Sequence, residues 1–412
     1  MAEQSVYVRH MMPVLQAALA DTPVVCLLGP RQVGKTTLAQ QVAPSTPYIS
    51  FDDPNLVTVA QQDPVGFVAG LPASVVLDEV QRVPGLFTAI KASVDKDRTP
   101  GRFLLTGSAN LLLLPKVQES LAGRMEIVLL QPLSEMEKQG GHYCLLQALL
   151  DGSIKTEISG EQTVVPGLAE AVCSGGYPEP LRRNPARARQ WYRQYLNAIM
   201  QRDVNDITAI KSTDDLAKLM ALLAYRTANL LNVSGLSNEL DINRETVEKY
   251  LGILERLFLV RRLPAWHRND AKRLIKTPKI HVVDSGLAAV LHRLAMEDWS
   301  FQSTEFGGLL ESFVVQQFIC QAGWVDSDLK FSHYRDKDQV EVDLVIERGR
   351  EVWAVEVKRA SSFNENDGAG LARLALQAGE QFKGGILLYS GSNCLPMKQA
   401  NCFAVPMDRL WS

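Results

Sequence analysis

Short apolar runs alternate with amphipathic helical patterns over the first 140 residues of the chain. Continuous apolar runs at 23–28, 74–77 and 102–106 predict buried strands, and the segment 126–130 predicts a fourth. Buried strands separated by helical segments are typical of βαβ units that build a parallel sheet. The pattern therefore predicts an α/β fold for this part of the chain.

The hydrophobic pattern becomes helical after about residue 168 and changes again later in the chain. The segment 214–284 predicts three helices and a short hairpin, and a strand pair at 340–346 and 352–357 lies in the α/β segment that follows. We therefore expect four domains: a parallel α/β core at 1–140, a helical lid or linker at 141–212, a helix and hairpin domain at 213–285, and a second α/β domain at 286–412.

The composition excludes several classes of protein. Hydrophobic residues make up 46% and charged residues 22% of the 412 residues, which are globular values. Lys and Arg number 43 against 46 Asp and Glu, so a globally basic nucleic-acid coat is excluded while a local basic patch is not. No apolar run reaches the length of a membrane span, no secretory pattern opens the chain, and the six cysteines form no Cys-x-x-Cys pair. These features predict a cytoplasmic protein with reduced thiols and no membrane partner.

A phosphate-binding loop follows the first predicted strand. Residues 29–36 match G-x-x-x-x-G-K-[ST] and open a predicted helix, which is the context that such a loop requires. Its backbone N–H groups and the helix N-terminus suit a phosphate, Lys35 suits the β- and γ-phosphates, and the Thr36 hydroxyl suits Mg²⁺. The sequence therefore predicts ATP and Mg²⁺ as cofactors, with nucleotide contacts from Gly29, Pro30, Arg31, Gln32, Val33, Gly34, Lys35, Thr36 and Thr37.

Polar residues end the second and third buried strands. Asp78 and Glu79 follow the apolar run 74–77, and the carboxyl ends of parallel strands meet at the ligand crevice. We expect Asp78 to hold Mg²⁺ and Glu79 to orient the attacking water, which favours a hydrolase. Ser108 or Asn110, after the third strand, would contact the γ-phosphate; we prefer Ser108, and a plain turn is the alternative.

These motifs resemble a known family. The phosphate loop, Leu-Asp-Glu-Val-Gln at 77–81, Leu-Leu-Thr-Gly-Ser at 104–108 and Leu-Ala-Gly-Arg at 121–124 look like the AAA+ ATPase core of a large prokaryotic group with a C-terminal domain of unknown function 4143. The resemblance implies a homo-oligomeric ring in which Arg124 reaches the γ-phosphate of a neighbouring subunit. The alternative for Arg124 is a surface arginine that pairs with Glu119 or Glu126.

The segment 213–285 has the order of a winged helix-turn-helix. Its second and third predicted helices would be followed by a wing built from the hairpin, and Asn243 would cap the recognition helix. The stretch 242–280 carries ten Lys or Arg and four Asp or Glu, a local charge of +6. This favours DNA as a partner, although winged helices also serve as protein-binding modules. The expected DNA contacts are Arg244, Lys249, Arg268, Lys272, Arg273 and Lys276.

Three acids and a lysine suggest a metal site in the last α/β domain. Asp343 lies on one strand of the predicted pair, Glu356 and Lys358 share a face of the other, and Glu311 lies on the preceding helix. The pattern resembles a PD-(D/E)xK nuclease core, except that Val342 replaces the proline. The resemblance implies a second Mg²⁺ or Mn²⁺ held by Glu311, Asp343 and Glu356, with Lys358 orienting the attacking water. The alternative is an inactive remnant with a salt-bridged strand pair that still binds DNA or protein.

The combined prediction is an α/β protein with a P-loop AAA+ core, a helical linker, a winged helix and a nuclease-like tail. Such a chain would hydrolyse ATP to drive or gate DNA binding or processing. The alternative is a nucleotide-dependent regulatory switch that binds a protein partner or DNA and carries an inactive tail.

Overall fold

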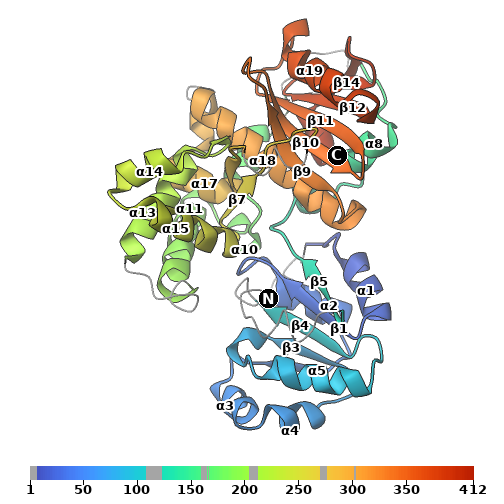
Figure 1. Ribbon diagram of the computed structural model, residues 1–412, viewed down its shortest axis with the longest axis vertical. Helices are drawn as coiled ribbons and strands as arrows, with labels where there is room; N and C mark the ends of the chain where they lie inside the picture. The colour runs from blue at the N-terminus through green and yellow to red at the C-terminus, as the bar shows by residue number, and fades with distance from the viewer. Residues whose placement is uncertain are drawn as a thin grey trace.

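The computed structural model describes residues 7–107, 123–158, 165, 167–203, 212–269, 276–300 and 303–412. Ser108, Asn110, Lys272 and Arg273 lie outside the described residues. The described chain forms three lobes: an N-terminal one, a middle one and a C-terminal one (Figure 1). No helix among the described residues is long and apolar enough to cross a membrane.

The N-terminal lobe is a parallel sheet with helices on both faces. Its strands are β1 (Val24–Leu28), β2 (Tyr48–Ser50), β3 (Val75–Asp78), β4 (Phe103–Gly107) and β5 (Met125–Leu129), in the order β2-β3-β4-β1-β5. The α/β fold class is thus confirmed, together with the four expected strands; the short β2 is an addition. Its helices are α1 (Met12–Asp21), α2 (Lys35–Val42), α3 (Pro54–Gln62), α4 (Pro64–Ala69), η1 (Val80–Arg82) and α5 (Leu86–Lys96).

Strand β1 shows why this sheet is buried on both faces. Val25 and Leu27 pack into a core with α1 and α2, whereas Val24, Cys26 and Leu28 pack into a second core with α5. All five side chains are buried, so the strand is continuously apolar, as expected for a central parallel strand. The polar ends of the strands are therefore the part of this sheet that is available for chemistry.

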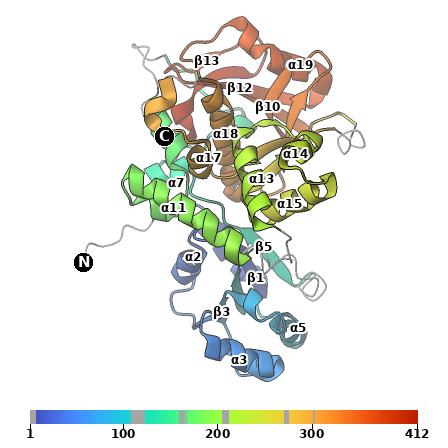
Figure 2. The ribbon, with the colours of Figure 1, turned by 90° about the vertical axis from the view of Figure 1, so that its left-hand side faces the viewer.

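After the sheet the chain forms α7 (Glu135–Gln139) and then passes to the C-terminal lobe. There it forms α8 (Leu145–Asp151), which contacts the C-terminal sheet, and the Tyr143 N–H donates to the carbonyl of Ser412 at 2.9 Å. It returns through α9 (Leu168–Ser174), α10 (Pro178–Leu181), α11 (Pro185–Ala198) and the π-turn η3 (Ile199–Asp203). Figure 2 shows α11 crossing the molecule between α2 and α7.

The middle lobe combines helices with a small antiparallel sheet. The helices are α13 (Thr213–Tyr225), α14 (Val233–Leu240), α15 (Arg244–Arg256), α17 (Ser285–His292) and η4 (Met296–Ser300). The strands β6 (Asn229–Leu230), β7 (Val260–Leu263) and β8 (Lys279–Val282) have the order β6-β8-β7. The Asn243 side chain accepts from the Thr246 N–H at 2.7 Å, so the expected cap of α15 is present.

The C-terminal lobe is a mixed sheet that packs on the long helix α18 (Ser303–Val325). The strands are β9 (Lys330–Arg335), β10 (Glu341–Arg348), β11 (Glu351–Lys358), β12 (Phe382–Tyr389), β13 (Leu395–Pro396) and β14 (Cys402–Pro406), in the order β13-β14-β12-β11-β10-β9. The expected strand pair is β10 and β11, which are antiparallel. The short helices are η5 (Glu365–Gly368), α19 (Ala369–Ala378), η6 (Gly379–Gln381) and η7 (Met407–Leu410).

Candidate nucleotide site and C-terminal carboxylate cluster

The predicted phosphate loop connects β1 to α2, with glycine where the backbone requires it. Gly34 precedes α2 with φ 97°, and Gly29 has φ 156°. A Cβ on Gly29 would lie 2.2 Å from the carbonyl oxygen of Leu130, so no larger residue fits there. The loop thus leads directly into a helix N-terminus, whose free N–H groups and dipole favour an anion.

Lys35 lies inside this loop. Its Nζ donates to the carbonyls of Gly29 at 3.1 Å and Pro30 at 2.8 Å, and the residue is 7% exposed. Burial of the aliphatic stem holds the ammonium at the concave side of the loop, where a phosphate would meet the backbone N–H groups. A contact of Lys35 with the β- and γ-phosphates stays a prediction.

Asp78 joins the ends of three strands to the loop. The Thr36 hydroxyl donates to Asp78 Oδ2 at 3.1 Å, and the hydroxyls of Tyr48 and Thr106 also donate to the Asp78 carboxylate. Burial, with the bond to Asp78 second, raises the pKa of Tyr48, so its proton stays on the phenol. The Thr36 hydroxyl and the Asp78 carboxylate lie side by side and offer oxygen ligands that suit Mg²⁺. A bound Mg²⁺ would polarise the phosphates.

Tyr48 and Thr106 are site residues that the sequence analysis missed. Thr106 is the penultimate residue of β4 and belongs to the Leu-Leu-Thr-Gly-Ser motif, so its place near a strand end was a signal. Tyr48 begins the short strand β2, which the apolar pattern did not indicate. Only the pairing of β2 with β3 brings Tyr48 to Asp78.

Glu79 leaves β3 in a strained backbone conformation. Its φ is 55° and its ψ 39°, and its side chain accepts from the Gln81 amide. A left-handed conformation costs a residue other than glycine roughly 1–2 kcal/mol. Such strain persists where the surrounding fold enforces it, and here it turns the Glu79 side chain away from the strand direction. The Glu79 carboxylate therefore follows the Asp78 carboxylate directly in the chain, and its predicted role in orienting water stays a prediction.

Two further side chains support the phosphate loop from behind. The buried Arg9 donates to the carbonyls of Val33 at 2.8 Å and Gln131 at 2.7 Å, and to Glu137 Oε1 at 2.9 Å. The Tyr195 hydroxyl, on α11, donates to the carbonyl of Arg31 at 3.3 Å. Neither residue belongs to a motif, so neither could be assigned to the site from the sequence.

The C-terminal sheet brings together the three predicted acids. Glu311 from α18, Asp343 from β10 and Glu356 from β11 form what we call the carboxylate cluster. Burial, followed by the charge of Asp343, raises the pKa of both Glu311 and Glu356. Lys358 does not join them, because its ammonium pairs with Asp367 on η5.

A lysine that the sequence analysis did not assign to the site lies in the cluster instead. Lys279, on β8 of the middle lobe, places Nζ 2.7 Å from Glu311 Oε1 and 3.3 Å from Asp343 Oδ1. Burial lowers the pKa of Lys279, but Glu311, Asp343 and Glu341 outweigh burial and raise it overall. In this arrangement the three acids do not fit Mg²⁺ or Mn²⁺, and the described residues contain no group of three or more His, Cys, Asp or Glu that could hold a metal ion.

Family models match three parts of the chain. An AAA domain matches residues 21–138, a domain of unknown function, DUF8612, matches 166–298, and a domain of unknown function, DUF4143, matches 306–410. Residues 21–138 thus match an AAA domain and residues 306–410 a DUF4143 tail. The AAA domain contains the phosphate loop, Asp78 and Glu79, and the DUF4143 tail contains the carboxylate cluster.

Similar proteins extend over most of this chain. An uncharacterized protein of Mycobacterium tuberculosis is 29% identical over 401 residues, which is 96% of this chain and 82% of the relative. An uncharacterized protein of Methanocaldococcus jannaschii is 22% identical over 353 residues, 81% of this chain and 74% of the relative.

Two solved structures resemble it more distantly. A Walker-type ATPase of Pyrococcus abyssi has a TM-score of 0.41 at 17% identity and covers 70% of this chain and 97% of its own. RuvB of Thermotoga maritima has a TM-score of 0.29 at 18% identity and covers 61% of this chain and 87% of its own.

Arg124 of the AAA domain makes a contact within its own chain. Its Nε lies 2.5 Å from Asp95 Oδ1 on α5, and its side chain is 24% exposed. Asp95 is a partner that was not expected from the sequence, and Glu119, one of the two expected partners, lies outside the described residues. A role for Arg124 in a neighbouring subunit stays a prediction.

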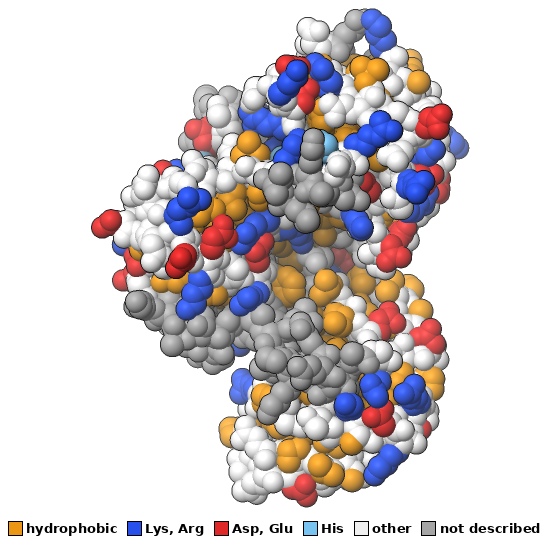
Figure 3. All heavy atoms as spheres, viewed as in Figure 1, with side chains coloured by type: hydrophobic (Ala, Val, Ile, Leu, Met, Phe, Trp, Pro, Cys, Tyr) orange, Lys and Arg blue, Asp and Glu red, His pale blue; other side chains and the backbone are white. Residues whose placement is uncertain are grey.

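The described basic residues of the middle lobe differ in availability. Arg244, Lys249 and Arg268 are exposed, and Lys276 is half-buried. Arg261 and Arg262, which also belong to the basic stretch, are engaged with Gln316 and with Glu248. On the face of the molecule in Figure 3, basic and acidic side chains are intermixed.

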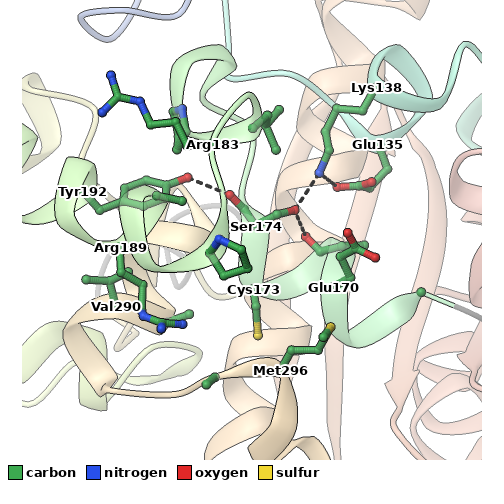
Figure 4. A pocket seen from close by; sticks show the side chains of 18 of the residues that line it. Glu135, Lys138, Glu170, Cys173, Ser174, Arg183, Arg189, Tyr192, Val290 and Met296 are labelled. Atoms are coloured by element: carbon green, nitrogen blue, oxygen red, sulfur yellow. Dashed lines mark hydrogen bonds and ion pairs between the residues drawn. The ribbon is translucent and has the colours of Figure 1, made fainter.

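A cavity of about 410 Å³ lies apart from the phosphate loop, between α7, α9, α11, α17 and η4 (Figure 4). Glu135 and Lys138 line the cavity and form a buried ion pair. The Lys138 ammonium also donates to Ser174 Oγ at 2.9 Å and to the Gly175 carbonyl at 3.0 Å. The three hydrogens of that ammonium thus have acceptors within the protein. Lys35, Thr36 and Asp78 do not line this cavity, so it is separate from the nucleotide site.

Proposed function

We propose that this AAA ATPase hydrolyses ATP at the phosphate loop and uses the cycle to drive or gate contacts of its middle lobe with DNA. The observation that carries the proposal is the Thr36–Asp78 pair at the strand ends, with Glu79 directly beside it. Lys35 and the loop N–H groups would bind the phosphates, and Mg²⁺ would neutralise charge that develops on them. Glu79 would orient the attacking water and accept its proton.

The test is the rate of phosphate release with and without single- and double-stranded DNA. Stimulation by DNA would support the proposal, and a chain that binds labelled ATP but releases no phosphate would contradict hydrolysis. A Lys35→Ala variant serves as the control for contaminating ATPases. Salt-sensitive duplex binding that weakens in Arg244→Ala and Lys249→Ala would support α15 as the contact, because exposed cations bind DNA phosphates.

A nucleotide-dependent switch with an inert tail is the second candidate. The observation that favours it is Lys279, whose ammonium binds Glu311 and Asp343, two of the acids that a nuclease would use for a metal ion. In that case the middle lobe would bind a protein partner or DNA in one nucleotide state. An ATPase rate that is indifferent to DNA, together with the absence of Mn²⁺-dependent cleavage, would favour the switch over the motor.

Assembly into a homo-oligomeric ring belongs to the same proposal. Arg124 would then exchange Asp95 for the γ-phosphate of the next subunit. We expect turnover per subunit to rise with protein concentration and to lose that dependence in Arg124→Ala. Equal turnover per subunit at every concentration, in both proteins, would contradict the shared site.

A further inference from the structure

We propose that Lys279 is the resident cation of the carboxylate cluster, and that it keeps divalent metal ions out of the DUF4143 tail while it locks the middle lobe to that tail. The inference concerns a site remote from the phosphate loop and does not depend on ATP hydrolysis.

The geometry of the ammonium is the first support. Nζ of Lys279 lies 2.7 Å from Glu311, 3.3 Å from Asp343 and 3.6 Å from Glu341, and the side chain is 4% exposed. Arg335 also binds Glu341, at 2.5 Å, so that acid is shared between two cations. A divalent ion would need these same oxygens at about 2.0–2.6 Å. Ammonium and metal ion therefore cannot occupy the cluster together.

The arrangement of β8 fixes the lysine there. Lys279 and His281 lie two residues apart on the strand and so point to the same side, and His281 Nδ1 lies 2.9 Å from Ser312 Oγ on α18. The Thr227 hydroxyl, next to β6, lies 2.7 Å from the same Ser312 oxygen. These bonds hold β8 against α18, and with β8 they hold the backbone of Lys279 beside the cluster.

Lys279 and the acids of the cluster come from different regions of the chain. Lys279 lies within the part of the chain that the DUF8612 model matches, whereas Glu311, Asp343 and Glu356 lie within the DUF4143 match. A cation from one region thus neutralises acids of the other. A buried charge that loses its partner is strongly destabilising. The ion pairs of Lys279 therefore hold the middle lobe to the tail, in addition to excluding metal ions from the cluster.

The first test measures Mn²⁺ binding to the nucleotide-free, chelator-treated full chain by electron paramagnetic resonance. We expect Lys279→Ala to gain about one Mn²⁺ per chain, because three carboxylates then face one another without a cation. The gain should disappear in Lys279→Ala/Asp343→Ala, and Lys330→Ala, at an exposed lysine that begins β9, should behave as the unaltered chain. Equal Asp343-dependent Mn²⁺ binding in the unaltered chain and in Lys279→Ala would overturn the proposal.

The second test holds even if Lys279→Ala fails to fold. Reductive methylation of the unaltered chain, read by mass spectrometry, should modify Lys279 at least tenfold more slowly than Lys330, with or without saturating Mn²⁺. A Lys279 that becomes reactive when Mn²⁺ is added would show that metal displaces it, and would equally overturn the proposal. Unchanged protection in Mn²⁺ supports the resident lysine.

Discussion

Single residues decide whether the phosphate loop is catalytic. Glu79 follows Asp78 at the end of β3, and in the proposed mechanism its carboxylate would take a proton from water. We expect Glu79→Gln to bind fluorescent ATP normally and to lower phosphate release by roughly 10²-fold or more, because general-base catalysis contributes about 10²–10⁴-fold. Glu380→Gln, at an exposed glutamate, is the matched control. Undiminished turnover in Glu79→Gln would remove Glu79 from the mechanism.

The backbone of Glu79 leads to a separate prediction on stability. At φ 55° a glycine is unstrained, whereas alanine keeps the penalty. We expect Glu79→Gly to be more stable than Glu79→Ala by about 1 kcal/mol in urea unfolding. Because both variants lack the carboxylate, the comparison isolates the conformation. Equal stabilities would show that the left-handed conformation stores no strain.

His333 gives a pH dependence that is also set at one residue. Burial, with the charge of Lys279 second, lowers the pKa of His333 to about 4. Below the unfolded pKa of about 6.5 the unfolded chain binds the proton and the folded chain does not, so stability falls as the pH drops from about 6.5 towards 4. Between pH 6.5 and 5 this loss amounts to about 2 kcal/mol. In urea unfolding at both pH values, His333→Gln should lose measurably less than the unaltered chain, and an equal loss would contradict the assignment.

At the scale of elements, the phosphate loop depends on segments far from it in the sequence. Arg9, three residues before α1 begins, connects the loop to the segment after β5 and to α7 through Val33, Gln131 and Glu137. Arg9→Met should leave Glu137 buried without its partner and weaken ATP binding at least tenfold, with a loss of about 3 kcal/mol in unfolding free energy. The double variant Arg9→Met/Glu137→Met should lose less than the sum of the two single variants. Additive losses would show that the two residues act independently.

The same elements show what the sequence predicts well and what it does not. Three features could be predicted because each depends on neighbouring residues with a fixed period or spacing: the loop 29–36, Asp78 and the strand pair. The place of Lys279 was not, since it lies 32 residues from Glu311 and 64 from Asp343 on a different sheet. A count of local charge assigns such a lysine to a basic stretch. Only the packing of β8 against α18 turns it into a partner for acids.

At the scale of the whole molecule, α18 ties the three lobes together (Figure 1). Each of its buried polar residues binds a different segment: Gln317 accepts from the Glu135 N–H of α7 at 2.8 Å, and Gln321 accepts from the Leu146 N–H of α8 at 2.9 Å. Gln316 accepts from Arg261 of β7 at 2.8 Å. These hydrogen bonds satisfy buried groups that belong to the rest of the chain, so the tail is part of the common core rather than an appended module.

The tail should therefore be indispensable for folding of the preceding regions. A chain truncated after residue 302 would expose the apolar surface that packs on α18, where Leu309, Phe313 and Phe318 join one core with residues of α1, β1 and α13. We expect the truncated chain to lack the cooperative thermal unfolding of the full chain and to lose ATP binding, as measured by circular dichroism and nucleotide fluorescence. Truncation after Trp411, which removes Ser412 alone, should lower the melting temperature without abolishing the transition, because it removes the Ser412 carbonyl that accepts from the Tyr143 N–H at 2.9 Å. If residues 1–302 unfolded at the temperature of the full chain and still bound ATP, the lobes would be independent and α18 would serve the tail alone.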